Sequence, residues 1–242
     1  MTGPWQDIAG DAGTGMLLTA DHASAHVPDG IDLGVPASVM AEHVAVDIGV
    51  APLAAALCAA LRCPGVLGGT SRLVIDLNRE EDSPGLIPLV SDGHEIPGNA
   101  DAADGAERAR RIAAYWHPYH QRIAAALLAA RPRLLLSLHS FTPRLRDGAP
   151  RPWEVGILYN QDDRAARLAL PRLTERGVVA GDNQPYSGKV LNATMNQHAE
   201  AGGIPYLGIE VRQDLIGDAE GVARWCAVLA PVIADVAAEL TR

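Results

Sequence analysis

Short apolar runs alternate with longer segments of helical pattern along the whole chain, and this alternation limits the possible folds more than any other feature. The run at 134–138 is continuously apolar, which is typical of a strand buried in the centre of a sheet. Strands that alternate with helices predict an α/β fold, here a mixed, mostly parallel sheet with helices on both faces. Because the 242 residues contain no repeat, low-complexity stretch or linker, we expect one domain over residues 1–242.

The expected elements are assigned from hydrophobic periodicity and from the positions of proline and glycine. Strands are predicted at 16–20, 66–67, 71–79, 134–140, 155–159, 178–180 and 206–211. Helices are predicted at 39–61, 106–131, 162–176, 190–201 and 218–240, with Pro52 as a break or the first turn of a second segment and Pro118 as a kink or split. Residues 1–14 are expected to be a loose lead-in, and the Pro- and Gly-containing segment 80–104 to be a lid or rim.

The segment Ser71–Arg79 carries more charge than a strand usually does. On a strand, its leucines and isoleucine would share one face, and Arg72, Asp76 and Asn78 would share the other. Such groups are costly to bury unless they pair with each other or with a ligand. One hypothesis is an internal Arg–Asp ion pair that stiffens the sheet. The other is an anion-binding wall, because the arginine fork matches the two oxygens of a carboxylate.

Composition excludes several classes of protein. A net charge of −9 argues against nucleic acid as a partner. Three cysteines without a C-x-x-C pair favour free thiols in a reducing compartment. The first basic residue is Arg62, no apolar signal-peptide core precedes it, and the uncharged run 48–61 is too short to span a bilayer. We therefore expect a cytoplasmic protein that acts on a small molecule, without membrane contact; the sequence makes no prediction of oligomeric state.

Three of the predicted strands end in reactive side chains, His22, His139 and Glu210. Two histidines and a carboxylate, with water as a fourth ligand, are typical of a catalytic zinc site. A separate glutamate would then take a proton from that water. The alternative is that the histidines are ordinary hydrogen-bonded residues. Motifs for a serine nucleophile elbow, a phosphate-binding loop or an H-E-x-x-H zinc helix are absent from the sequence.

Six short motifs follow one another along nearly the whole chain: Asp21-His22-Ala23-Ser24, Asp47-Ile48-Gly49, Ser71–Arg79, Leu138–Pro143, Asp182–Gly188 and Gly208–Asp214. In this order they resemble the N-formylglutamate amidohydrolase family. Each motif alone is weak, but the combination is specific. The resemblance implies an amidohydrolase whose fold is similar to that of the zinc carboxypeptidases, a mixed sheet flanked by helices.

The resemblance also implies a metal site. His22 and His139 match the zinc ligands. The carboxypeptidase pattern has a glutamate three residues after the first histidine, where this chain has Ala25. Asp47 is therefore the candidate for the third ligand, since it matches the family's Asp-x-Gly.

The remaining site residues are carried over in the same way. Asn78 and Arg79 resemble the pair that holds a substrate carboxylate, and Glu210 resembles the general base. Arg72 and Arg212 are candidates for a second carboxylate or for the oxyanion.

Three functions remain open at this point. The first is a zinc-dependent amidohydrolase that releases formate from an acidic amino acid derivative such as N-formyl-L-glutamate. The second applies the same chemistry to another N-acyl amino acid or a small peptide, because family membership does not determine the substrate. The third is a metal-free relative that binds an anion and has no activity.

Overall fold

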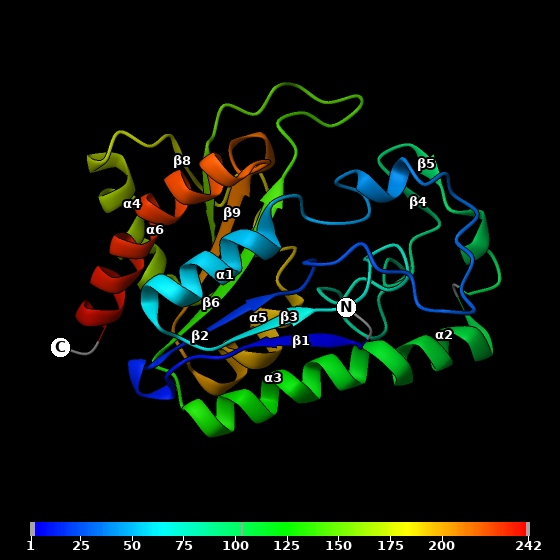
Figure 1. The fold of residues 1–242 in the computed structure, drawn as a ribbon, viewed down its shortest axis with the longest axis horizontal. Helices are drawn as coiled ribbons and strands as arrows, with labels where there is room; N and C mark the ends of the chain where they lie inside the picture. Colours follow the sequence, from blue (N-terminus) through cyan, green and yellow to red (C-terminus); the bar gives the residue numbers. More distant parts are fainter. Residues whose placement is uncertain (1–2, 103, 241–242) are drawn as a thin grey trace.

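The structure of the protein is a computed structural model that describes residues 3–102 and 104–240 (Figure 1). Its centre is a seven-stranded sheet in the order β1-β3-β2-β6-β9-β7-β8. The strands are β1 Trp5–Ile8, β2 Met16–Ala20, β3 Gly65–Gly68, β6 Leu134–Phe141, β7 Val155–Leu158, β8 Ala180–Asp182 and β9 Tyr206–Arg212. The β1–β3 and β7–β9 pairs are antiparallel and the others are parallel. The expected mixed, mostly parallel sheet is confirmed.

Helices cover both faces of this sheet, as expected (Figure 1). On one face lie α1 Val50–Leu61, α4 Arg164–Glu175 and α6 Ala219–Glu239. On the other lie α3 His117–Ala130 and the short α5 Ala193–His198; α2 Gly105–Arg111 runs into α3 through a π-helical turn at Ile112–Trp116. Single 3-10 turns occur at Ala12–Thr14, Val39–Ala41, Pro97–Asn99, Glu200–Gly202 and Gln213–Leu215, and a small hairpin pairs β4 Val90–Ser91 with β5 His94–Glu95.

The predicted central strand is confirmed. All eight residues of β6 are buried, and β6 is the middle strand of the sheet. By length and composition alone, α6 is apolar enough to cross a membrane, with a mean hydropathy of 1.5. In this fold, however, α6 packs against α1 and α4 and buries Trp225, Leu229 and Ile233, as the core helix of a globular protein does.

The prediction of a strand at Ser71–Arg79 is wrong. The segment is a series of turns, in which Ser71 O accepts a hydrogen bond from Val74 N at 2.9 Å. The side chains of Ser71 and Asp76 also accept backbone N–H groups two residues ahead, an arrangement that competes with strand pairing. A strand would place Val74 on the same face as Arg72 and Asp76. Val74 is instead as fully buried as Leu73 and Ile75, so the segment has no separate polar face. The turns instead carry Arg72, Asp76 and Arg79 toward the end of the sheet.

Three other boundaries differ from expectation. The predicted helix 39–61 is regular only from Val50, because Gly49 has a φ of +80° and an added Cβ there would meet Ile216 O at 2.2 Å. Pro52 accordingly lies in the first turn of α1. The expected lead-in 1–14 contains β1, which pairs with β3 at the sheet edge. The segment 80–104 includes the β4–β5 hairpin and one 3-10 turn.

Candidate metal centre and active site

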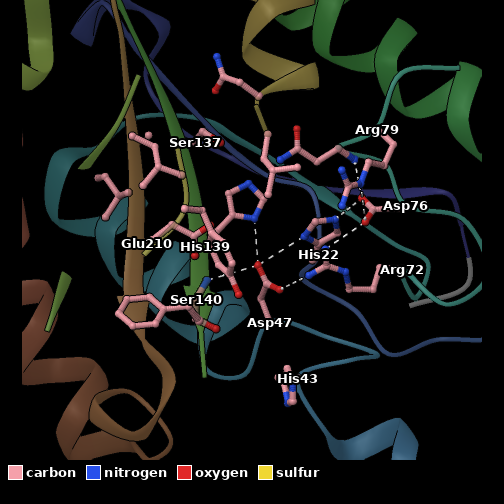
Figure 2. A pocket seen from close by; sticks show the side chains of 18 of the residues that line it. His22, His43, Asp47, Arg72, Asp76, Arg79, Ser137, His139, Ser140 and Glu210 are labelled. Atoms are coloured by element: carbon pink, nitrogen blue, oxygen red, sulfur yellow. Dashed lines mark hydrogen bonds and ion pairs between the residues drawn. The ribbon is translucent and has the colours of Figure 1, made fainter. Parts of the chain in front are cut away.

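A cavity of about 180 Å³ opens at the carboxyl ends of the central strands (Figure 2). Open α/β sheets commonly place their sites at this edge. His22 follows β2 by two residues, while His139 and Glu210 lie within β6 and β9 and are direct cross-strand neighbours. Asp47 comes from the turn before α1, whose first turn is closed by a hydrogen bond from Val50 N to Asp47 O. The structure brings these four side chains together at the cavity.

His22, Asp47 and His139 form a buried cluster whose donor atoms all lie within 4.8 Å of one another. Nδ1 of His139 is 2.9 Å from Asp47 Oδ2, and Nδ1 of His22 is 3.5 Å from the same oxygen. Figure 2 shows the two imidazoles turned toward this carboxylate. Among the described residues, His22 Nδ1 has no hydrogen-bond partner although it is buried. A buried nitrogen of this kind needs a ligand.

The other nitrogen of each imidazole faces a second carboxylate. His22 Nε2 is 2.7 Å from Asp76 Oδ1, and His139 Nε2 is 3.1 Å from Asp21 Oδ2. Carboxylates in this position orient metal-binding histidines and increase their basicity. The two histidines therefore present the same nitrogen, Nδ1, to one point, and each is supported from behind.

The carboxylates of the cluster remain ionised although they are buried. Burial opposes ionisation, but His22 and Arg72 hold the pKa of Asp76 well below its ordinary value. The two histidines lower the pKa of Asp47 in the same way. For His139, burial favours the neutral ring, yet Asp21 and Asp47 raise its pKa well above the ordinary value. An electrostatic field that stabilises an imidazolium also stabilises a metal cation at the same place.

This donor set fits a divalent metal ion such as zinc. Two imidazole nitrogens and one carboxylate oxygen, each with a supporting hydrogen bond or ion pair, are the usual protein ligands of a catalytic zinc, which keeps a fourth position open. The carboxylate also has other partners, because Asp47 Oδ2 accepts a hydrogen bond from Ser140 N and Oδ1 accepts one from Arg72 Nη1 at 3.2 Å.

Glu210 lies beside the cluster and is buried. Burial raises the pKa of Glu210 to about 7, and Asp47 acts in the same direction while His139 and Arg72 oppose it. Its Oε2 makes no hydrogen bond to the described residues. A carboxylate with a pKa near neutrality and a free oxygen, next to a metal site, has the properties of a general base.

The candidate substrate-binding residues separate into three groups. Arg79 and Asn78 line the cavity, and the only ion pair of Arg79 with a described residue is a long one, 3.8 Å from Nε to Asp76 Oδ2. Arg72 also lines the cavity but pairs with Asp47 and, at 3.0 Å, with Asp76. Arg212 is not brought to the cavity wall; its Nε donates to Asp214 Oδ1 at 2.8 Å.

Sequence reasoning missed the residues that lie behind His139. Asp21 has no exposed surface, and its Oδ1 accepts hydrogen bonds from Tyr119 Oη at 2.7 Å and Thr194 Oγ1 at 3.1 Å. Tyr119 and Thr194 are separated from Asp21 by 98 and 173 positions, so no local pattern connects them. The one available signal was the position of Asp21, at a strand end next to His22.

Other histidines have structural partners. His43 lines the cavity, but its Nε2 is 3.0 Å from Asp92 Oδ2, and Figure 2 shows it apart from the metal cluster. His43 and Asp47 lie outside any regular helix, since residues 43–45 form a turn and α1 begins at Val50. His120 and His198 are stacked, with Nδ1 of His120 2.9 Å from Nε2 of His198.

Comparison with known proteins adds three findings. The model of the N-formylglutamate amidohydrolase family matches residues 14–217. A crystal structure of a gene product from Agrobacterium tumefaciens is 31% identical, with a TM-score of 0.91 over 98% of this chain and 96% of that one. The N-formylglutamate amidohydrolase of Ralstonia eutropha JMP134 is 22% identical, with a TM-score of 0.69 over 99% and 98% of the two chains, which shows a shared fold. No curated protein sequence matches the chain.

Proposed function

Because the chain belongs to the N-formylglutamate amidohydrolase family, we propose that it is a zinc-dependent hydrolase of the linear amide bond in N-acyl amino acids. The observation that carries this proposal is the convergence of His22, Asp47 and His139 beside the buried Glu210. N-formyl-L-glutamate, the substrate in the family's name, is the first candidate. Another N-acyl amino acid, or a small peptide, is the alternative that the same chemistry allows.

In this proposal His22, Asp47 and His139 hold the ion through two imidazole nitrogens and one carboxylate oxygen. The chemistry that zinc would supply at this place is polarisation of the acyl carbonyl and a lower pKa of water, toward about 7. Asp76 and Asp21 keep the two imidazoles in place. Arg72 fixes the orientation of Asp47 and contributes positive charge where the carbonyl oxygen becomes an oxyanion.

Glu210 moves the proton. It takes a proton from the attacking water as general base and returns it to the nitrogen of the leaving amino acid. Its raised pKa suits both steps, since a group with a pKa near the working pH accepts and donates with similar ease. The neighbouring position of His139 in the sheet keeps Glu210 close to the metal ligands.

The substrate carboxylate is assigned to Asn78 and Arg79. Asn78 Oδ1 accepts a hydrogen bond from Thr194 N at 3.0 Å, which orients the side-chain amide of Asn78. In this proposal its Nδ2 group donates to the substrate carboxylate. Arg79 has no side-chain hydrogen bond to the described residues, so its guanidinium is available to a carboxylate. Binding at this end holds the amide at a fixed distance from the metal and converts binding into orientation. Arg212 has no part in this proposal.

A substrate panel tests the proposal. The purified protein is assayed with N-formyl, N-acetyl and N-succinyl amino acids, with and without added zinc, and its metal content is measured. About one equivalent of zinc and chelator-sensitive hydrolysis of one N-acyl series support it. A protein without metal or hydrolysis that still binds carboxylates would be an anion-binding relative, and the proposal would be rejected.

A further inference from the structure

Positive charge is confined to one side of the cavity. Figure 2 shows Arg72, Asp76 and Arg79 together on the His22 side, away from Glu210. On the Glu210 side, the described lining residues form an uncharged wall. This wall consists of Ser137 on β6, Gly208 and Ile209 on β9 and Leu158 on β7.

The sheet register places the floor of this uncharged side. Ser137 on β6 pairs with Gly208 on β9, and Gly208 pairs in turn with Leu158 on β7. The three residues form one row, two positions before His139 and Glu210 on the same face of the sheet. Two residues of strand span about 7 Å. The row therefore lies about 7 Å from His139 and Glu210, which is roughly the length of an extended amino-acid side chain.

The carboxylate site and this row are connected by the start of α5. Asn78 accepts its hydrogen bond from Thr194 N. Leu191 and Asn192, which come shortly before Thr194 in the sequence, line the same cavity. Asn192 is held by its own hydrogen bond, Nδ2 to Tyr206 Oη at 2.9 Å. An amino acid whose carboxylate binds Asn78 and Arg79 therefore has its side chain beside the Ser137–Gly208–Leu158 row.

The described residues that line the cavity include two arginines, and both guanidiniums are engaged. Arg79 is used by the α-carboxylate, and Arg72 already pairs with two aspartates. Arg151 is not among the lining residues; it stacks on the ring of Tyr186 at 4.7 Å and donates Nη1 to the Tyr186 hydroxyl and to Thr142 O. A buried carboxylate without a cation is strongly disfavoured.

We propose that the row Ser137–Gly208–Leu158 is the floor of a side-chain subsite that selects N-acyl amino acids with an uncharged, mainly apolar side chain over N-acyl glutamate. The inference rests on the proposed amidohydrolase function and chooses between its two substrate classes. Ser137 is the specificity-determining residue, because it lies on the floor and its hydroxyl makes no hydrogen bond to the described residues.

The first experiment compares N-formyl-L-glutamine with N-formyl-L-glutamate, which have nearly the same shape and differ in charge, and adds N-formyl-L-leucine. We expect kcat/KM for glutamine and leucine to exceed that for glutamate by at least about tenfold, a typical discrimination between a paired and an unpaired polar group. Equal or faster hydrolysis of N-formyl-L-glutamate would overturn the inference while leaving the amidohydrolase function intact.

The second experiment changes the floor. Ser137→Val fills part of the recess and should lower the ratio of kcat/KM for N-formyl-leucine to that for N-formyl-glycine by about tenfold, as expected for overpacking. Ser38→Val makes the same chemical change at a position without a side-chain capping bond and should leave the ratio unchanged. Equal effects of Ser137→Val on both substrates would contradict the assignment of Ser137.

A binding measurement decides the inference even if no N-formyl amino acid is hydrolysed. Pentanoate and glutarate share a five-carbon chain, differ by one terminal carboxylate and contain no amide. Calorimetry should show at least about tenfold tighter binding of pentanoate, and Ser137→Val should weaken it. Tighter binding of glutarate would overturn the inference. Absence of hydrolysis of every N-acyl amino acid would instead reject the proposed function.

Discussion

Nε2 of His139 lies 3.1 Å from Oδ2 of Asp21, a carboxylate with no exposed surface. The other oxygen of Asp21 accepts hydrogen bonds from Tyr119 and Thr194, so the carboxylate cannot rotate away. His139 is thus held from behind by a group that is itself held on two sides. This arrangement directs Nδ1 of His139 at Asp47 and defines one corner of the proposed metal site.

Asp21→Asn should weaken zinc binding by about 10- to 100-fold, the usual effect of losing the supporting carboxylate of a metal-binding histidine. The variant keeps the shape of the side chain and removes its charge. A competition titration against a chromogenic chelator measures the affinity. Thr194→Val, which removes one hydrogen bond to Asp21 but keeps its charge, should have a smaller effect. Equal zinc affinity in Asp21→Asn and the wild type would contradict the role of Asp21.

Arg79→Ala should reduce kcat/KM for an N-acyl amino acid by about 10- to 100-fold, because a charged hydrogen bond to the substrate contributes about 1.5–3 kcal/mol. Arg79→Lys should recover only part of this loss, since an ammonium lacks the bidentate fork. Arg176→Ala is the control, because Arg176 is the C-cap residue of α4 and does not line the cavity. An unchanged kcat/KM in Arg79→Ala would place the carboxylate elsewhere.

Much of the fold and of the candidate site was predictable from local pattern. The continuous apolar run of β6 indicates a central strand, and polar residues at strand ends indicate a candidate site, where the structure places His22, His139 and Glu210 around one cavity. Asp47 was predicted only through the family motif. The carboxyl ends of parallel strands lie at one edge of the sheet in any open α/β fold, so polar residues at these ends indicate where a site can form.

The errors have a common physical cause, which is that side-chain capping and long-range packing override local periodicity. The alternation in Ser71–Arg79 is compatible with a strand, but Ser71 and Asp76 capture the backbone N–H groups that a neighbouring strand would need. Gly49 keeps regular helix from starting before Val50, through its positive φ and its close approach to Ile216, which is 167 positions away. The support of His139 by Tyr119 and Thr194 likewise depends on contacts that no window of sequence contains.

Asn99→Ala should destabilise the fold by at least about 2 kcal/mol. Asn99 is fully buried, donates Nδ2 to Leu73 O and Pro88 O at 2.8 Å, and accepts from Arg111 Nη1 at 2.7 Å. Its loss leaves buried polar groups unsatisfied, at about 1–3 kcal/mol each. Urea unfolding measures the change, with the exposed Gln121→Ala as control. A free energy of unfolding within about 0.5 kcal/mol of the wild type would show that the segment is held by other contacts.

The His120–His198 pair should make the folded state less stable in mild acid. Burial lowers the pKa of His120 to about 4, and burial also lowers that of His198. When the folded pKa is below the unfolded value of 6.5, the unfolded state takes up the proton first, so stability falls as the pH drops from about 6.5 toward 4. For His120 alone the loss between pH 7 and pH 5 is about 2 kcal/mol.

His120→Gln tests this contribution, because it removes the titrating ring from the pair. Urea unfolding of both proteins at pH 7 and pH 5 should show a smaller loss of stability in the variant, by about 2 kcal/mol. Identical losses in the two proteins would mean that His120 is protonated in the folded state, against the hydrogen bonds seen here. In those bonds Nε2 of His120 donates to Leu77 O, and Nδ1 accepts from His198.

The central claim is that Glu210 moves the proton while His22, Asp47 and His139 hold the metal, and Glu210→Gln tests it most directly. One sample of this variant serves for both zinc content and turnover of the best N-acyl amino acid in the panel. We predict about one equivalent of zinc, as in the wild type, and a rate lowered by at least about 100-fold, the usual contribution of a general base. Wild-type turnover in a variant that retains zinc would contradict the assignment of Glu210 as the base.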